Sequence, residues 1–398
     1  MYTDLHDQAV STKSDRAFKF YLKGLDKLLG LDDDGISDFQ KSINLDPEFA
    51  LVYALLANQC LYFDTRKNAT KYLKLAIKHK KKSSQREQSI IRLIELMVNG
   101  NGKSLNIALE HIDNFPRDVI VLSFVLGPFG LLAFSGNLNW RQINLDIMQK
   151  VSSNFLPNDW WFATTHAFIL IENTHYKQAI NKAESAWEIK KNGNCAHTLT
   201  HLHYETANYD QGRCFINKWS NSIGKNSNFS HHLLWHDALC ALKLNAEDEV
   251  YEICKRLINT KKKTLPMDYL ADNSSLLWYC VINNIDVPNS WFIKISTFIK
   301  DAFPDIGFNF VDMHRLMITA TQGSKERDSL LKKLYNSQNP DQKYLTDLFN
   351  GFISFYDKKY KESIQYLIRP VANNAFFGGS NVQRNIIEIT QNIALNKI

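Results

Sequence analysis

The chain has 398 residues, of which 44% are hydrophobic and 22% are charged, and this balance excludes bulk disorder. Its 16 glycines and 9 prolines are fewer than usual, which disfavours a turn-rich all-β fold and favours long helices with short connections. The 47 basic and 41 acidic residues leave a net charge of +6, far from the dense basic face of a nucleic-acid binder. We therefore expect an all-α protein whose partner is not a nucleic acid.

Six cysteines lack the CxxC spacing of metal and redox motifs, and five of them fall between positions 195 and 280. A cysteine within a helix is usually a small buried hydrophobic residue, so we expect reduced thiols and a cytoplasmic protein. The polar residues before the first apolar run lead us to expect no secretory signal. The longest apolar stretch, 119–134, contains Gly127 and Pro128 and falls short of the ~20 residues of a membrane span. We expect a buried helix that breaks near this pair, and no membrane span.

A turn between two helices is predicted at 44–50, where Asp46 can cap a helix and Pro47 can occupy its first position. The apolar ladder of 51–58 follows. Three further segments place an aromatic residue after a short polar turn, with small residues at helical spacing, at 175–186, 209–212 and 356–367. These features are typical of tetratricopeptide repeats, in which small residues let two helices pack closely.

The fold class predicted from these signatures is all-α, with tetratricopeptide-like helical hairpins that form a curled right-handed superhelix with an inner cavity. No low-complexity linker interrupts the chain, so we expect a single α-solenoid domain over 1–398, with 1–14 as a flexible arm. The N- and C-terminal repeats are expected to approach each other. The basic runs 78–82 and 261–263 are expected at helix ends, where cations complement the helix dipole.

Histidines recur at helical spacing in the middle of the chain. His197, His201 and Glu205 follow i, i+4, i+8 spacing, and His232 and His236 repeat the i, i+4 pair, so each set shares one helix face. Two such faces could ligate a divalent metal or pass protons near neutral pH. No HExxH motif is present, which leaves zinc-peptidase chemistry without its usual general base. The alternative, that these histidines are buried packing residues near Trp235 and Tyr204, has about equal weight.

Two further polar clusters occur where a helix would normally bury apolar residues. One consists of Asp268, Asp272, Asn273 and Ser274, just before 276–278. It can also be explained as an ordinary helix start, with acidic residues near the positive end of the dipole. The other consists of Asp312 and His314, which interrupt the aromatic-rich run at 308–310. Both clusters are candidate walls of a polar pocket.

The string Gly378-Gly379-Ser380 precedes a predicted helix whose first turn contains Gln383 and Arg384. Free N–H groups at such a helix start bind anions, and the guanidinium adds a fork of donors. We therefore expect this turn to close the cavity and to bind a carboxylate or phosphate. The simpler alternative is a turn in which Ser380 is a plain N-cap.

Five strings occur in a fixed order along the chain: His197 to His203, His232 with Trp235-His236, Asp268 to Ser275 with Leu277, Phe310 to Met317, and Gly378 to Ser380 with Gln383-Arg384. Arg86-Glu87-Gln88 and the helix of Glu172 add weaker matches. In this order and spacing the chain resembles the tetratricopeptide repeat protein 38 family, from about residue 14 to the end. The resemblance implies an all-α repeat fold, and no activity general to the family.

Three positions depart from the family pattern. Leu126-Gly127-Pro128 stands where members commonly have a His-Asp pair, Tyr279 stands where an arginine is usual, and Asn385 stands where an aspartate usually follows Gln-Arg. If these residues line a shared cavity, the resemblance implies that this chain takes a different ligand from its relatives.

Two functions are compatible with the sequence. The first is a His/Asp-lined inner pocket for a small anionic molecule, with acid-base or metal-assisted chemistry such as hydrolysis, elimination or cyclisation. The second is a non-catalytic protein-interaction adaptor that uses the concave repeat surface. The pocket is slightly favoured, because histidines and aspartates dispersed over nearly two hundred residues suit a closed cavity better than an open groove.

The pocket hypothesis assigns a role to each candidate residue. The predicted catalytic residues are His197, His201, His236, Asp272, Asp312 and His314. The predicted ligand-binding residues are Glu205, His232, Trp235, Asn273, Ser380, Gln383 and Arg384. The candidate metal ligands are His197, His201, His232 and His236. A divalent metal is the candidate cofactor because of the two histidine pairs, and no nucleotide or flavin motif is present.

Overall fold

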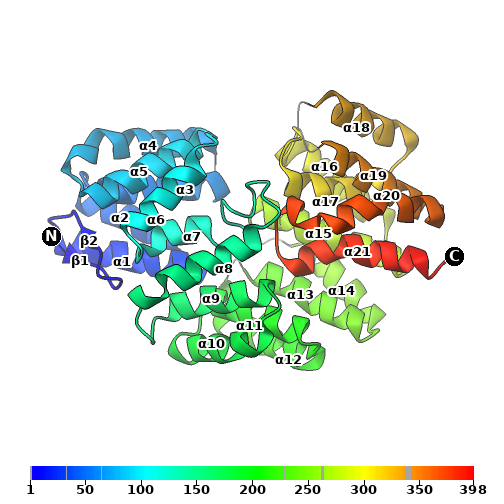
Figure 1. Cartoon of the computed structure of the whole chain (residues 1–398), viewed down its shortest axis with the longest axis horizontal. Coiled ribbons are helices and arrows are strands. Elements are labelled where there is room, and N and C mark those ends of the chain that lie inside the picture. Colours follow the sequence, from blue (N-terminus) through cyan, green and yellow to red (C-terminus); the bar gives the residue numbers. More distant parts are fainter. Residues whose placement is uncertain (1, 33, 64, 228, 261–263, 338–341) are drawn as a thin grey trace. The chain divides into compact units, whose positions relative to one another are not determined.

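The computed structural model describes residues 2–32, 34–63, 65–227, 229–260, 264–337 and 342–398. Within these residues, 21 α-helices follow one another with short connections, and the only sheet is a pair of two-residue strands. Figure 1 shows the succession of helices. The predicted all-α class of tetratricopeptide-like helical hairpins is confirmed.

The elements of the first half are β1 (Tyr2–Thr3), β2 (Ala9–Val10), α1 (Asp15–Gly30), α2 (Gly35–Leu45), α3 (Ala50–Phe63), α4 (Arg66–His79), η1 (Lys80–Lys82), α5 (Gln85–Val98), α6 (Ser104–Asn114), α7 (Val119–Val125), α8 (Trp140–Val151), η2 (Ser152–Asn154), α9 (Trp160–Glu172) and α10 (Tyr176–Ile189). Those of the second half are α11 (Gly193–Glu205), α12 (Tyr209–Ser220), η3 (Ile223–Asn226), α13 (Ser230–Lys243), α14 (Glu247–Ile258), α15 (Pro266–Ile282), α16 (Asn289–Ala302), α17 (Asn309–Ala320), α18 (Ser324–Asn336), α19 (Gln342–Tyr356), α20 (Tyr360–Ala372), η4 (Asn374–Phe377) and α21 (Asn381–Leu395).

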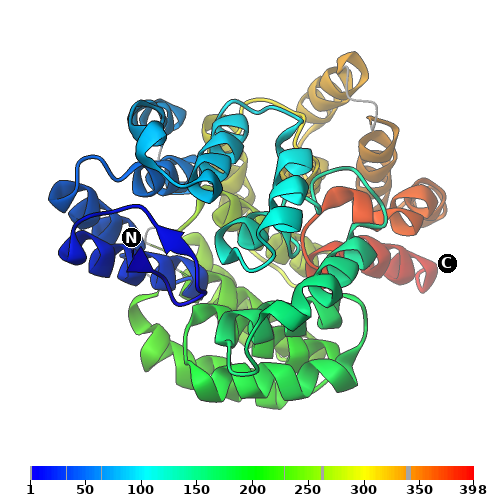
Figure 2. The ribbon, with the colours of Figure 1, turned by 60° about the vertical axis from the view of Figure 1, so that its left-hand side comes forward.

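Contacts divide the chain into two compact units. Unit 1 comprises residues 1–135, 141–199 and 221–229, and unit 2 comprises 136–140, 200–220 and 230–398. In unit 1, neighbouring helices pair as α1 with α2, α3 with α4 and α9 with α10, and in unit 2 as α13 with α14 and α19 with α20. Figure 2 shows the same helices from a second direction.

Small residues line the contact faces of these pairs. On α10, the buried residues are Ala179, Ala183 and Ala186, at the helical spacing read from the sequence. On α2, Phe39 lies so close to α1 that a Cβ at Gly24 would come within 2.6 Å of its ring. Close approach of the two backbones is therefore built into the hairpin by residues without bulky side chains.

Several predicted boundaries agree with the structure. Helix α7 ends at Val125, and Gly127 follows with a φ of +84°, so the apolar stretch breaks where expected. The basic run 78–82 spans the end of α4 and η1. The run 261–263 lies outside the described residues.

One predicted boundary is wrong. Asp46 ends α2 instead of starting the next helix, and α3 begins at Ala50, three residues after Pro47. The Asp46 carboxylate is used within the turn, where it accepts hydrogen bonds from Glu48 N and the Thr12 hydroxyl. The alternative explanation of the second cluster as a helix start agrees with the structure for Asp268, which lies in the first turn of α15, two residues after Pro266. Asp272, Asn273 and Ser274 lie further along the same helix.

The N-terminal residues form a hairpin in which Tyr2 pairs with Val10 and Thr3 with Ala9. Val10 is fully buried. All six cysteines are free of disulfide bonds. In the described residues, no helix combines the length and the apolar character that crossing a membrane requires.

Candidate functional site

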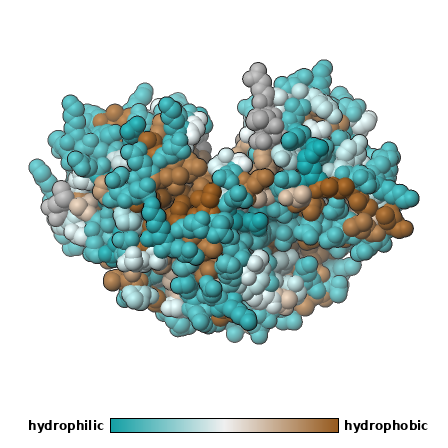
Figure 3. Space-filling view, in the orientation of Figure 1, coloured by the Kyte–Doolittle hydropathy of each residue, from teal (hydrophilic) through white to brown (hydrophobic). Residues whose placement is uncertain are grey.

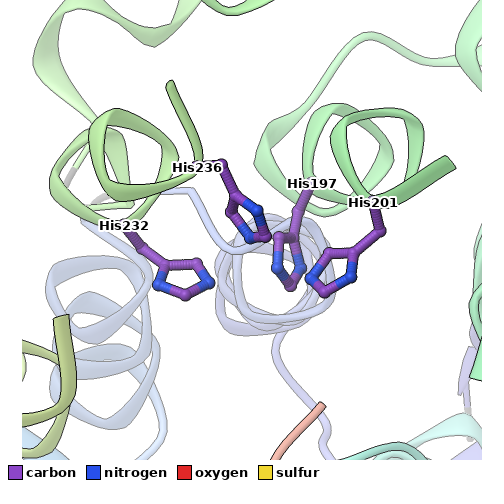
Figure 4. Close-up of side chains that lie close together, drawn as sticks. All are labelled: His197, His201, His232 and His236. Atoms are coloured by element: carbon purple, nitrogen blue, oxygen red, sulfur yellow. The ribbon is translucent and has the colours of Figure 1, made fainter. Parts of the chain in front are cut away.

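Helices α11 and α13 each present two histidines one turn apart. Figure 4 shows His201 on α11 turned toward His232 and His236 on α13. One ring nitrogen of each of these three lies within 4.8 Å of the others, and all three residues are buried. We call His201, His232 and His236 the histidine cluster. The boundary between the units falls within α11, after residue 199, so the cluster belongs to unit 2 and His197, which is also buried, belongs to unit 1.

The three imidazoles of unit 2 are in direct contact. The ring centroids of His201 and His236 are 4.5 Å apart, and those of His232 and His236 are 4.8 Å apart, with nearly perpendicular planes in both pairs. His201 and His236 have no exposed surface. Three nitrogen donors are therefore held in one small volume that is closed to solvent.

A buried carboxylate on α15 fixes the orientation of one ring. Asp272 Oδ1 accepts a hydrogen bond from His232 Nδ1 at 2.8 Å, and its other oxygen lies 3.2 Å from His231 Nδ1. An ionised carboxylate can only accept, so the proton of the neutral His232 ring is on Nδ1 and the lone pair is on Nε2. This carboxylate–histidine arrangement is the one that orients metal-ligating imidazoles in proteins.

The electrostatics of the cluster differ from ring to ring. Burial, with a smaller contribution from nearby His232, holds the pKa of His201 well below its ordinary value, so this ring is neutral at neutral pH. Burial alone would lower the pKa of His232, but the charge and hydrogen bond of Asp272, with the charge of Asp268, together outweigh it and raise the pKa. Burial would likewise raise the pKa of Asp272, but His232 and His231 keep it lowered.

Trp235 supports the cluster by packing. Its ring stacks on His232 with centroids 5.3 Å apart, and its Nε1 donates to the Ser275 hydroxyl at 2.9 Å. Ser275 in turn donates to the carbonyl of Ala271 at 2.7 Å. The side chain predicted to bind a ligand thus connects α13 to α15 and fixes the position of the His232 ring.

Other predicted residues lie outside the cluster. Glu205 ends α11 and is not part of the group of converging nitrogens. Asn273 is buried on α15 and donates to the carbonyl of Tyr269 at 2.8 Å. His314 on α17 donates from Nδ1 to the carbonyl of Phe310 at 2.7 Å, and burial lowers its pKa to about 4. Its Nε2 finds no hydrogen-bond partner among the described residues.

Asp312, predicted as a catalytic residue, organises the turn before α17. Its Oδ2 accepts from Gly307 N at 2.7 Å, and its Oδ1 lies 3.2 Å from Arg315 Nε. Arg315 also donates to the carbonyls of Phe303 and Asp305. The Asp312 carboxylate therefore belongs to a structural network. It accepts from the N–H group of Gly307 in the turn and is the ionic partner of the Arg315 guanidinium on α17.

The C-terminal turn is also self-contained. Ser380 is the N-cap of α21 and forms a capping box with Gln383, as the simpler of the two hypotheses predicted. Gly379 has a φ of +78°, and a Cβ there would lie 2.4 Å from the ring of Phe310. The Arg384 side chain is fully buried, donates to Gly379 O and to Asn381 Oδ1, and lies 5.1 Å from the Trp140 ring centroid. Anion binding by this turn stays a prediction.

These contacts change the expected effect of Arg384→Ala. Because the guanidinium holds the turn and covers an aromatic ring, its loss should lower the free energy of unfolding by about 2 to 3 kcal/mol, as for charge-assisted hydrogen bonds. Urea unfolding followed by circular dichroism measures this. Arg369, half exposed and paired with Asp347, is the control, with an expected loss from Arg369→Ala of less than about 1 kcal/mol. Equal stability of the two variants would contradict the structural role.

Two cavities identify residues that sequence reasoning missed. One, of about 500 Å³ in unit 2, is lined by His231, Lys255 and Arg256 among others. The other, of about 240 Å³ in unit 1, is lined by Ser89 and His111 among others. The position of His231 next to His232 was a usable signal. Ser89 and His111 come from separate helices, α5 and α6, and share no spacing motif.

Together, the fold and the histidine cluster define an all-α helical-repeat protein with buried, converging imidazoles. No protein-family model matches the chain. Among solved structures, the chain is similar to the crystal structure of the P58(IPK) TPR domain, at 12% sequence identity and a TM-score of 0.22, with 96% of this chain and 89% of that one covered.

Proposed function

We propose that unit 2 binds a divalent transition metal through His201, His232 and His236. The observation that carries the proposal is the convergence of their ring nitrogens within 4.8 Å, with one of the rings oriented by a buried carboxylate. Imidazole nitrogens suit zinc, copper, nickel and iron, whereas magnesium and calcium prefer oxygen ligands. Zinc is the natural probe, because it accepts a tetrahedral set of nitrogens at about 2.0 to 2.1 Å.

The protonation states support this assignment. A metal ligand must be deprotonated, and the neutral His201 already satisfies this requirement. The Nδ1–H group of His232 donates a hydrogen bond to Asp272. In the neutral ring, the Nε2 lone pair is therefore the one available to a metal. A negative second partner also increases the basicity of that nitrogen and hence its affinity for a cation.

Burial favours a structural metal over a catalytic one. The three ligands are at most 5% exposed, and neither cavity described above is lined by a member of the histidine cluster. A catalytic metal keeps one position open to substrate or water, whereas a structural site is closed by protein ligands. The metal would then join α11 to α13 in a metal-stabilised helical-repeat protein.

Metal analysis of protein purified without a histidine tag tests this proposal. We expect about one zinc per chain after exposure to zinc and dialysis, and loss of binding in His201→Ala and His236→Ala. Asp272→Asn should weaken zinc affinity by about 10- to 100-fold, as for other second-shell changes.

The matched control is His203→Ala. His203 lies on the same helix as His201 but packs on Phe215, at a centroid distance of 6.0 Å, and is not part of the cluster. This variant should bind zinc like the wild type. Zinc bound equally by His201→Ala and His236→Ala, with unchanged helicity in both, would exclude the histidine cluster as the site.

A protein-interaction adaptor is the second candidate function. Helices α20 and α21, with the residues that follow them, leave four large apolar side chains exposed, and Figure 3 shows an apolar area over these helices. These side chains are Tyr366, Ile368, Leu395 and Ile398. Exposed apolar surface of this kind favours protein contact. An adaptor would bind its partner whether or not the histidine cluster is intact, which separates the two functions.

Membership of the tetratricopeptide repeat protein 38 family is a proposal that rests on the sequence strings described above. The predicted small anionic ligand and the acid-base chemistry have less support than the metal. Asp312 and Arg384, which were expected to line the cavity, are engaged in the turns before α17 and α21. The adjacent 500 Å³ cavity, with Lys255 and Arg256 on its wall, is the remaining place for such a ligand.

A further inference from the structure

Unit 1 contains a hydrogen-bonded line of three side chains from three separate elements. Ser89 lies on α5, His111 on α6, and Asp118 is the N-cap of α7. The Ser89 hydroxyl is 2.9 Å from His111 Nδ1, and His111 Nε2 is 3.0 Å from Asp118 Oδ2. The three residues therefore connect a hydroxyl, an imidazole and a carboxylate in series.

The carboxylate determines which way the protons point. Asp118 can only accept, so the neutral imidazole has its proton on Nε2 and its lone pair on Nδ1. The Ser89 hydroxyl then donates its proton to Nδ1. This is the relation between a serine nucleophile and its general base, with the two ring nitrogens exchanged relative to the usual serine protease arrangement.

The carboxylate itself is held firmly. Arg86 Nε donates to Asp118 Oδ2 at 2.6 Å, and Ile120 N donates to Oδ1 at 3.1 Å. Burial alone would raise the pKa of Asp118, but Arg86 and His111 hold it at about 2. The group thus stays ionised at neutral pH and keeps the imidazole in one tautomer.

The hydroxyl end of this line faces a cavity. Ser89 and His111 both line the cavity of about 240 Å³, and Lys80 and Arg92 add positive charge to its wall. Ile107 and Phe115 add apolar surface. The lining also includes Glu110, so the three charged side chains together contribute a net charge of +1. A small acyl group that ends in a carboxylate matches this size and charge.

We propose that this cavity is an acyl-transfer site that hydrolyses small esters with an anionic acyl group. Ser89 is the nucleophile, His111 is the general base, and Asp118 is a positioning residue that acts through the imidazole. The site lies wholly in unit 1 and does not depend on the metal.

The reaction balances without an additional cofactor. Ser89 Oγ attacks the ester carbonyl as its proton moves to His111 Nδ1, and the bond from carbonyl carbon to leaving oxygen breaks as that proton passes to the leaving alkoxide. An acyl-serine and an alcohol result. Water, deprotonated by the same nitrogen, then attacks the acyl carbon, and Ser89 recovers its proton as the carboxylic acid leaves. Lys80 and Arg92 are the cations available to the substrate carboxylate.

A fluorophosphonate probe, which phosphonylates an activated serine and releases fluoride, tests the nucleophile. We expect one adduct per chain, mapped to Ser89 by peptide mass spectrometry. Ser89→Ala should show no adduct, and Ser104→Ala, a serine variant on α6 outside the line, should be labelled like the wild type. An unlabelled wild type with native helicity, or an adduct at a different residue, would overturn the proposal.

The substrate class is tested with two esters of similar size. 4-Nitrophenyl hemisuccinate has a terminal carboxylate and 4-nitrophenyl butyrate does not. We expect a higher kcat/KM for the hemisuccinate, hydrolysis at the buffer rate in Ser89→Ala, and loss of the preference in Arg92→Gln. Equal hydrolysis by wild type and Ser89→Ala would show that the site is not catalytic.

Discussion

Zinc should raise the thermal unfolding midpoint of the wild-type protein, and chelation should lower it again. A ligand that binds only the folded state stabilises that state by about 4 kcal/mol at a free concentration a thousandfold above Kd. The expected effect is large because the metal would bridge α11 and α13 through imidazoles that are buried and already converge in the folded protein. Scanning calorimetry with zinc and with EDTA measures the change.

The matched variants separate this effect from nonspecific binding of zinc. His236→Ala should unfold at the same temperature with and without zinc, whereas His203→Ala should respond like the wild type. The response should also shrink as the pH falls, since a protonated imidazole cannot bind a metal. A wild-type midpoint that does not move with zinc, in protein shown to be metal-free at the start, would contradict the proposed function.

Asp118→Asn should destabilise unit 1 by about 3 to 5 kcal/mol, the usual cost of removing one partner from a buried ion pair. The carboxylate has no exposed surface, and Arg86 beside it is 5% exposed, so the variant leaves a buried guanidinium without its counter-charge. Asp118 also caps α7, and the amide can replace only part of that function. Urea unfolding at pH 7 measures the loss.

The pH dependence of this effect follows from the pKa of Asp118. The folded-state pKa is about 2, below the value of about 3.9 expected in the unfolded chain. The ionised Asp118 carboxylate therefore makes its full contribution to the free energy of unfolding above the unfolded-state pKa. That contribution is lost as the pH falls from about 4 toward 2. The stability difference between wild type and Asp118→Asn should narrow over that interval.

Asp113→Asn is the control for this prediction. Asp113 pairs with Lys150 at 2.6 Å, and both side chains are more than 60% exposed, so its loss should cost less than about 1 kcal/mol. A similar small loss for Asp118→Asn would mean that the buried network contributes little to stability.

The sequence by itself determined the local geometry of this protein. Few glycines and prolines and the spacing of apolar residues indicate helices, and the helical period places His197 with His201 and His232 with His236 on common faces. The Ser380–Gln383 capping box is likewise readable, because its partners are three residues apart. All of these features depend on residues within one or two turns of each other.

Tertiary structure decided what those faces meet. Asp272 reaches His232 across 40 positions, and Ser89, His111 and Asp118 come from three separate elements. Arg384 donates to Gly379 O in its own turn and also packs against Trp140, a residue distant in sequence. A helix fixes which of its residues share a face by its period. The choice of which helices pack against that face depends on the burial of many side chains that are distant in sequence. The spacing of residues within one helix does not predict this choice.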